Sequence, residues 1–174
     1  VAALFAAIIL KLGRIPRPGG HLIHRLVIIA VGMVIGFPLF TALALQYVSA
    51  SRAAIVVALL PAGTAIVATL RNGERPSWQF WLAALGGLTT VAVFVVSTGA
   101  GGRPEAADVL LLLAVVSAAI GYCEGATVAR ELGGWQTISW SLVIALPITA
   151  PLTLTSLLSH GAVDPTAGSM VGLA

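Results

Sequence analysis

Segments of about twenty apolar residues follow one another along this chain, and short polar loops separate them. A helical run of that length matches the hydrocarbon thickness of a bilayer. Of the 174 residues, 59% are hydrophobic and only 9% are charged, which lies outside the usage of soluble domains. The sequence therefore predicts an all-α membrane protein, a polytopic helix bundle whose solvent is the lipid bilayer.

We expect five complete spans and a partial span at each end of the chain. The complete spans are predicted at Leu26–Val48, Ala53–Leu70, Trp78–Thr98, Asp108–Ala129 and Thr137–Leu158, and the partial ones at Val1–Leu10 and Ser169–Ala174. Seven of the nine basic residues then fall on one side, which the positive-inside rule assigns to the cytoplasm. They are Lys11, Arg14, Arg17, Arg25, Arg71, Arg75 and Arg130, against Arg52 and Arg103 outside. These basic residues do not form a basic helix, so we expect no nucleic-acid partner.

A hairpin of two spans is predicted at Thr41–Thr69. Its elbow lies at Ser49–Ser51, where either serine can cap the helix that follows. Pro61 interrupts the second arm near its middle, because proline removes a backbone hydrogen bond and bends the helix. Interrupted helices at membrane depth recur in transporters.

Small residues recur at helical spacing on two of the spans. In the arm that contains Pro61 the small face is Ala54, Ala58, Ala62, Ala65 and Thr69, and the bulky face is Val56, Leu59, Leu60, Val67 and Leu70. The preceding span carries a Gly32 and Gly36 pair whose face continues through Phe40 and Leu43. Because small residues let helix backbones approach closely, we expect both small faces to meet other helices or a cavity.

Six residues are candidates for a substrate pathway and one for its outer mouth. The pathway candidates are Thr41, Pro61, Thr64, Ser117, Tyr122 and Glu124, and the mouth candidate is Arg52. Thr41, Pro61 and Thr64 are predicted near the midplane and Tyr122 about one turn further in, and together they could supply the few polar contacts of a mostly apolar pocket. Ordinary helix packing is the alternative interpretation for these residues. For Arg52 the alternative is a side chain that snorkels at a helix end.

Glu124 is the only acidic residue within a predicted span that lies beyond its first turn. Ser117, Gly121 and Glu124 share one helical face, which predicts that the carboxylate points into the bundle. An intramembrane carboxylate is a functional candidate, and its protonation could couple transport to protons. The alternative is a structural ion pair near the cytoplasmic surface, with Arg130 or a loop arginine as the partner.

The hairpin and the loop after it resemble the EamA family of the drug/metabolite transporter superfamily. The resemblance rests on ALALQYVSASRAAIVVALLPAGTAIVA at residues 42–68 and GERPSWQFWLAALGG at residues 73–87, with YCEGATVARELGGWQ at residues 122–136 similar to the start of a second repeat. It implies a ten-helix carrier built from two inverted five-helix repeats. Residues 1–98 would be the latter part of the first repeat, from the end of helix two to helix five. Residues 108–174 would hold helices six, seven and the start of eight, so the chain is expected to be truncated at both ends.

These features favour a membrane carrier that exports small metabolites or amino-acid-like compounds across a bacterial inner membrane by alternating access. We expect a small-molecule substrate, protons as candidate coupling ions and no cofactor. The alternatives are a non-transporting fragment or assembly subunit, and an intramembrane enzyme. An enzyme is disfavoured because no span pairs an acid with a histidine or a nucleophile with a base, so we expect no catalytic residue. His21 and His24 have no Cys or carboxylate beside them in the predicted loop, so we expect no metal site.

Overall fold

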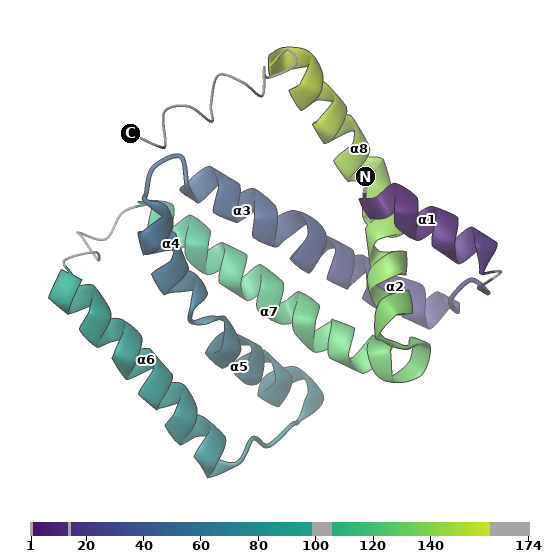
Figure 1. The fold of residues 1–174 in the computed structure, drawn as a ribbon. Helices are drawn as coiled ribbons and strands as arrows, with labels where there is room; N and C mark the ends of the chain where they lie inside the picture. The colour runs from purple at the N-terminus through teal and green to yellow at the C-terminus, as the bar shows by residue number, and fades with distance from the viewer. Residues whose placement is uncertain (1, 14, 99–105, 161–174) are drawn as a thin grey trace.

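The fold is an all-helical bundle arranged around one central helix (Figure 1). A computed structural model describes residues 2–13, 15–98 and 106–160. Its elements are α1 (Ala2–Leu12), α2 (Gly20–Ile29), the π-helix η1 (Ala30–Gly36), α3 (Phe37–Ala44), α4 (Ala50–Val57), α5 (Leu60–Asn72), α6 (Trp78–Thr98), α7 (Ala106–Leu132) and α8 (Gly134–His160). The predicted partial span at Ser169–Ala174 lies outside the described residues.

Helix α7 is the centre of the bundle. It packs against α2, η1, α3, α4, α5 and α8, whereas α1 packs against α8. Its most deeply buried positions include Ala114, Ala118 and Ala119, each at most 1% exposed. Because alanine side chains are short, several helices can approach α7 closely at once.

Within the part of the chain that the structure describes, four of the five predicted spans are helices long and apolar enough to cross a membrane. They are Gly20–Ala44, Ala50–Asn72, Ala106–Leu132 and Gly134–Thr155. The fifth, α6, is a continuous helix of 21 residues at the predicted place. The polytopic helix bundle expected from the sequence is therefore confirmed.

The first of these spans begins and ends earlier than its predicted range of Leu26–Val48. Gly19 is the extended N-cap residue of α2, so His21 and His24 are helical rather than part of a loop. The early start has a packing reason, because Leu22 and Leu26 lie one turn apart on the face that meets Val128 of α7.

The same span contains a π-helical stretch that the sequence analysis did not predict. Within it, the N–H of Phe37 donates to the carbonyl of Gly32, one residue further back than in an α-helix. Pro38 follows directly and cannot donate a backbone hydrogen bond. Widening the turn before a proline is one way to accommodate its ring, so Pro38 is the local sequence cause we assign to η1.

The GxxxG pair forms the predicted helix contact. A Cβ atom added to Gly32 would lie 2.6 Å from the backbone oxygen of Ser117, and one added to Gly36 would meet the Ser117 hydroxyl. A Cβ atom on Gly121 would lie 3.0 Å from the Cβ of Met33. The span and α7 therefore touch backbone to backbone, which only glycine allows here.

The predicted break before Pro61 is also present. Helix α4 ends at Val57, and α5 begins at Leu60 after a two-residue turn. In that turn the N–H of Leu59 donates to the carbonyl of Val56, at the spacing of a 3₁₀ turn. Of the two serines in the predicted elbow, Ser49 is the cap, because its hydroxyl accepts from the N–H of Arg52.

The small face of this interrupted span was only partly assigned correctly. Ala65 is buried, and Ala58 and Ala62 line a cavity of about 270 Å³ beside α6, although Ala58 is exposed, as are Ala54 and Thr69. On the predicted bulky face, Val56 packs against the buried cluster of Ala44, Ala53 and Leu111, so this face also contacts other helices. The helix restarts before Pro61, so a single helical period does not continue from α4 into α5.

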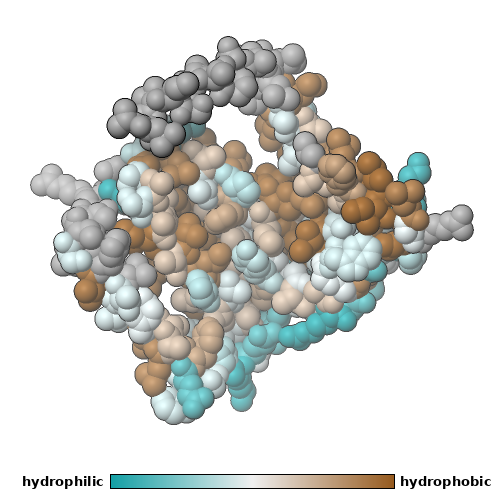
Figure 2. Space-filling view, viewed as in Figure 1, coloured by the Kyte–Doolittle hydropathy of each residue, from teal (hydrophilic) through white to brown (hydrophobic). Residues whose placement is uncertain are grey.

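Apolar side chains cover much of the visible surface, and hydrophilic ones gather along its lower edge (Figure 2). Leu70, Leu82 and Leu152 are among the exposed large hydrophobic residues. Exposure on this scale is unfavourable in water but costs nothing in hydrocarbon. The surface therefore agrees with a bundle surrounded by lipid or by further helices.

Candidate functional site

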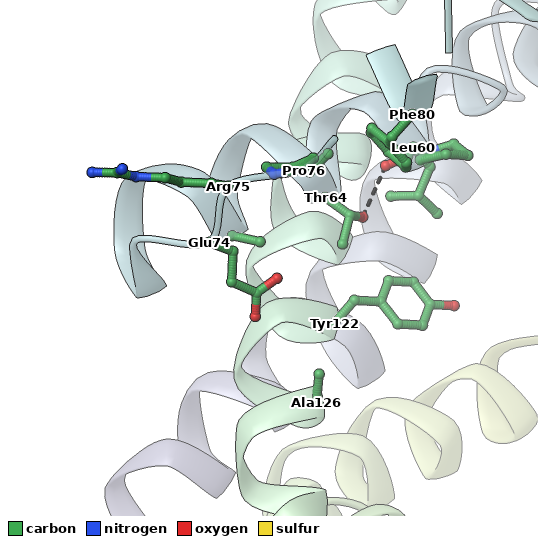
Figure 3. A pocket seen from close by; sticks show the side chains of 11 residues that line it. Leu60, Thr64, Glu74, Arg75, Pro76, Phe80, Tyr122 and Ala126 are labelled. Atoms are coloured by element: carbon green, nitrogen blue, oxygen red, sulfur yellow. Dashed lines mark hydrogen bonds between the residues drawn. The ribbon is translucent and has the colours of Figure 1, made fainter. Parts of the chain in front are cut away.

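A cavity of about 710 Å³ lies between α5, α6 and α7 (Figure 3). Its walls are Leu60, Pro61, Thr64, Ala65 and Ala68 of α5, Glu74, Arg75 and Pro76 of the following loop, Phe80 of α6, and Tyr122 and Ala126 of α7. Most of these side chains are apolar and few carry a polar group. A cavity of this size and composition is typical of small-molecule sites.

Three of the candidate pathway residues meet in this cavity. Pro61 and Thr64 come from the start of α5, and Tyr122 lines the same cavity from α7. Figure 3 shows Thr64 and Tyr122 on neighbouring helices. The Thr64 hydroxyl donates to the carbonyl of Leu60 at 2.8 Å and keeps acceptor capacity for a ligand. The phenol of Tyr122 can both donate and accept. The helix break thus lies beside the polar groups of the cavity.

The charged lining residues lie at the end of the bundle where α2 begins and α5 and α7 end, which we call the basic end. Glu74 directs its carboxylate toward Tyr122 and Ala126, while the Arg75 guanidinium points away from the other lining residues (Figure 3). Glu74 also pairs with Arg130, with 3.6 Å between Nη2 and Oε1. A ligand in the cavity would therefore meet a carboxylate on the side nearest the basic end.

Glu124 is buried inside the bundle, next to but not lining this cavity. Its side chain is 5% exposed, and its Oε1 lies 2.5 Å from Nε of Arg71 on α5. Its Oε2 lies 3.8 Å from Nε of Arg25 on α2 and has no hydrogen-bond partner. Of the two kinds of partner considered from the sequence, the structure shows arginines that were predicted in loops. These are Arg25 and Arg71, which the structure places on α2 and α5, whereas Arg130 pairs with Glu74.

Arg52 lies at the opposite end of the bundle and is not free to act as an open anion site. Its Nε donates to Oδ1 of Asp108 at 3.0 Å, and its Nη2 donates to Oδ2 at 2.6 Å. The arginine side chain is 11% exposed and the aspartate 24%. Arg52 therefore joins the start of α4 to the start of α7 by a two-point ion pair, rather than snorkelling alone.

The remaining two candidates lie away from the cavity. The Thr41 hydroxyl donates to the carbonyl of Phe37 at 2.7 Å, within α3. Ser117 packs against Gly36 and lines a separate apolar cavity of about 270 Å³ between α2, η1 and α7. The seven candidates therefore divide into a cavity group, a buried ion pair, an end-of-helix ion pair and two packing positions.

Several lining residues were not candidates from the sequence, namely Leu60, Glu74, Arg75 and Phe80. Gly73, Glu74 and Arg75 were identified only as part of the resemblance to the EamA family. The sequence held a local signal only for the end of this helix: Gly73 adopts the left-handed conformation that terminates α5, so Glu74 lies just beyond the helix. The aromatic partner from α6 had no such signal, since it depends on how two helices pack.

His21, which the sequence analysis considered as half of a metal pair, contacts a carboxylate instead of a second histidine. Its Nε2 lies 3.4 Å from Oε2 of Glu131, and both side chains are largely exposed. Within the described residues no group of three metal-ligating side chains is present. The contact therefore links the start of α2 to the end of α7.

The apolar spans, the broken helix and the cavity between the spans define a polytopic helical membrane protein. Residues 1–97 match the EamA-like transporter family, and the chain belongs to that family. The chain is also 42% identical over 153 residues to a protein named "Uncharacterized transporter YdeK" from Bacillus subtilis (strain 168). That similarity covers 88% of this chain and 53% of the relative, so the chain spans about half the relative's length. No solved structure matches the chain.

Proposed function

We propose that this chain is part of a carrier that exports small metabolites or amino-acid-like compounds by alternating access. The observation that carries the proposal is the cavity between α5, α6 and α7, which is large enough for a small molecule and lies beside a helix break. Family membership supports the same class of function. The complete carrier is proposed to have ten helices in two inverted repeats of five, in which residues 1–98 and 108–174 belong to different repeats.

The lining residues support an amphipathic substrate. Apolar side chains from three elements would bury its apolar part, while Thr64, Tyr122 and Glu74 offer hydrogen-bonding groups or a charge. Amino-acid-like compounds with an apolar side chain have this distribution. Export from the cytoplasm is proposed because the charged side of the cavity lies at the basic end, which the positive-inside rule assigns to the cytoplasm.

The proposed location is the plasma membrane of a bacterium, with the protein crossing it several times. The supporting observations are the spanning helices and the relative in Bacillus subtilis. Protons are the proposed coupling ions, with Glu124 as the titrating group, because an acidic residue inside a membrane bundle is a common carrier of transported protons.

The test is solute flux by the complete protein in proteoliposomes. A panel of radiolabelled amino acids, amines and carboxylic acids would be loaded inside, and efflux would be compared with that from protein-free liposomes. The proposal predicts saturable efflux of at least one amphipathic, amine-bearing compound. Equal efflux from both kinds of liposome for every compound, with the protein shown to be folded and inserted, would contradict it.

A further inference from the structure

The broken span is tied to α7 at both of its ends by ion pairs. Arg52 at the start of α4 binds Asp108 through two hydrogen bonds, and Arg71 near the end of α5 binds Glu124. The turn at Ala58 and Leu59 lies between the two attachments. Because the backbone ladder is interrupted there, the two halves of the span can move separately more easily than an unbroken helix could.

The two attachments differ in how securely their partners are held. The Arg52–Asp108 pair is two-pointed, with both carboxylate oxygens bonded to one guanidinium. In the Arg71–Glu124 pair one carboxylate oxygen is bonded, while the buried Oε2 has no hydrogen bond and lies 3.8 Å from Arg25 of α2. The Glu124 carboxylate therefore has a second cation nearby, Arg25 of α2. If the contact with Arg71 breaks, the buried carboxylate still has a positively charged partner.

The cavity depends on the position of α5 relative to α7. Five of its lining residues belong to α5 and two to α7, so a shift of α5 changes the width between these walls. Arg71 lies one turn beyond the lining residue Ala68, and Glu124 lies between the α7 lining residues Tyr122 and Ala126. The ion pair thus lies next to the cavity on both of the helices that bound it.

We propose that the Arg71–Glu124 pair is a latch that holds α5 against α7, and that its release lets α5 pivot about the Pro61 break and open the cavity wall. During release Glu124 remains paired with Arg25. The role of the latch in transport rests on the proposed carrier function. The movement of α5 is tested by a measurement that does not require transport.

The first test measures access to the cavity wall in the complete protein. Ala65 is a buried lining residue, so Ala65→Cys in a Cys123→Ala background reports opening through its rate of maleimide labelling. Arg71→Gln and Glu124→Gln should each raise that rate about five- to thirtyfold, the population change expected from losing a modest interaction. Glu131→Gln removes the same charge at an exposed position of α7 and should leave the rate unchanged. Unchanged labelling in both latch variants would overturn the proposal.

The second test closes the latch covalently and does not depend on variants that weaken the fold. The Asn72 amide donates to the sulfur of Cys123 at 3.3 Å, so Asn72→Cys places a thiol beside the native one. After oxidation to a disulfide, transport should fall to the protein-free level and recover when a reductant is added. Asn72→Cys combined with Cys123→Ala is the matched control, and its transport rate should not change when the oxidant is added. If the disulfide-linked protein transports as fast as the same protein after reduction, the latch proposal is wrong.

The two tests separate this inference from the proposed function. Faster labelling in the latch variants, with no solute transported by any version of the protein, would support the latch and contradict the carrier. Transport by the wild type, together with equal transport by oxidised and reduced Asn72→Cys, would support the carrier and contradict the latch.

Discussion

Arg52 and Asp108 join the first turns of α4 and α7 through two hydrogen bonds from one guanidinium to one carboxylate. The aspartate lies in the first turn of α7, where the helix dipole also favours a negative charge. These two residues are 56 positions apart in the sequence. The pair therefore fixes the hairpin elbow to the central helix at the end of the bundle opposite the basic end.

This relationship predicts that Asp108→Asn destabilises the protein. Losing a two-point bond to a mostly buried guanidinium should cost about 1.5–3 kcal/mol. The apparent melting temperature of the purified protein in detergent should fall, and Asp108→Glu should restore part of it. An unchanged melting temperature for Asp108→Asn would show that the pair contributes nothing to stability.

The close contact between η1 and α7 gives a second prediction. In Gly32→Ala the new methyl group would meet the backbone oxygen of Ser117, which cannot move as a side chain can. Overpacking of this kind costs about 1–3 kcal/mol. Gly86→Ala in α6 is the control, because nothing in the described chain lies within 4 Å of its added carbon. Thermal stability in detergent should drop for Gly32→Ala and not for Gly86→Ala. Equal stability of the two variants would show that Gly32 does not contact α7 closely.

Much of this fold could be predicted from the sequence because membrane spans depend mainly on local composition. The approximate places of the described spans, the break before Pro61 and the Gly32 contact followed from residues near one another in the chain. The central position of α7 did not, since it results from packing against six other elements. The early start of α2 also depended on a distant residue, Val128.

The candidate site was predictable to a lesser extent for the same reason. Thr41, Pro61, Thr64 and Tyr122 were expected to supply the polar contacts of one apolar pocket. The last three line one cavity, whereas the Thr41 hydroxyl bonds within α3. Which arginine would reach Glu124 could not be chosen, because Arg71 and Arg130 both end spans on the same side. Whether any of these residues contacts a substrate remains a prediction.

Membrane orientation can be tested by cysteine accessibility. In a Cys123→Ala background, cysteines replacing Gly19 and Gly73 should react with an impermeant maleimide only from the cytoplasm. A cysteine replacing Tyr47, which is exposed in the turn between α3 and α4, should react only from outside. The physical reason is the concentration of arginine and lysine in the loops at the basic end. Reaction of residues 47 and 73 from the same side would overturn the helix count between them.

Proton coupling through Glu124 predicts a difference between the two partners of one ion pair. Glu124→Gln keeps the side-chain volume but cannot release a proton, so efflux should no longer respond to a pH gradient. Arg71→Gln breaks the same contact and leaves the carboxyl group in place, so the response should persist. The measurement is gradient-driven flux per mole of protein. A gradient response in Glu124→Gln equal to that of the wild type would show that the carboxylate is structural.

The most direct test of the central claim is to block the cavity. Thr64→Trp would place a large ring among the lining residues, while Thr90→Trp puts the same ring on an exposed position of α6. Solute counterflow by the complete protein should be lost in the first variant and kept in the second, at equal amounts of inserted protein. Counterflow at the wild-type rate in Thr64→Trp would contradict the account, because the solute would then pass somewhere other than the cavity between α5, α6 and α7.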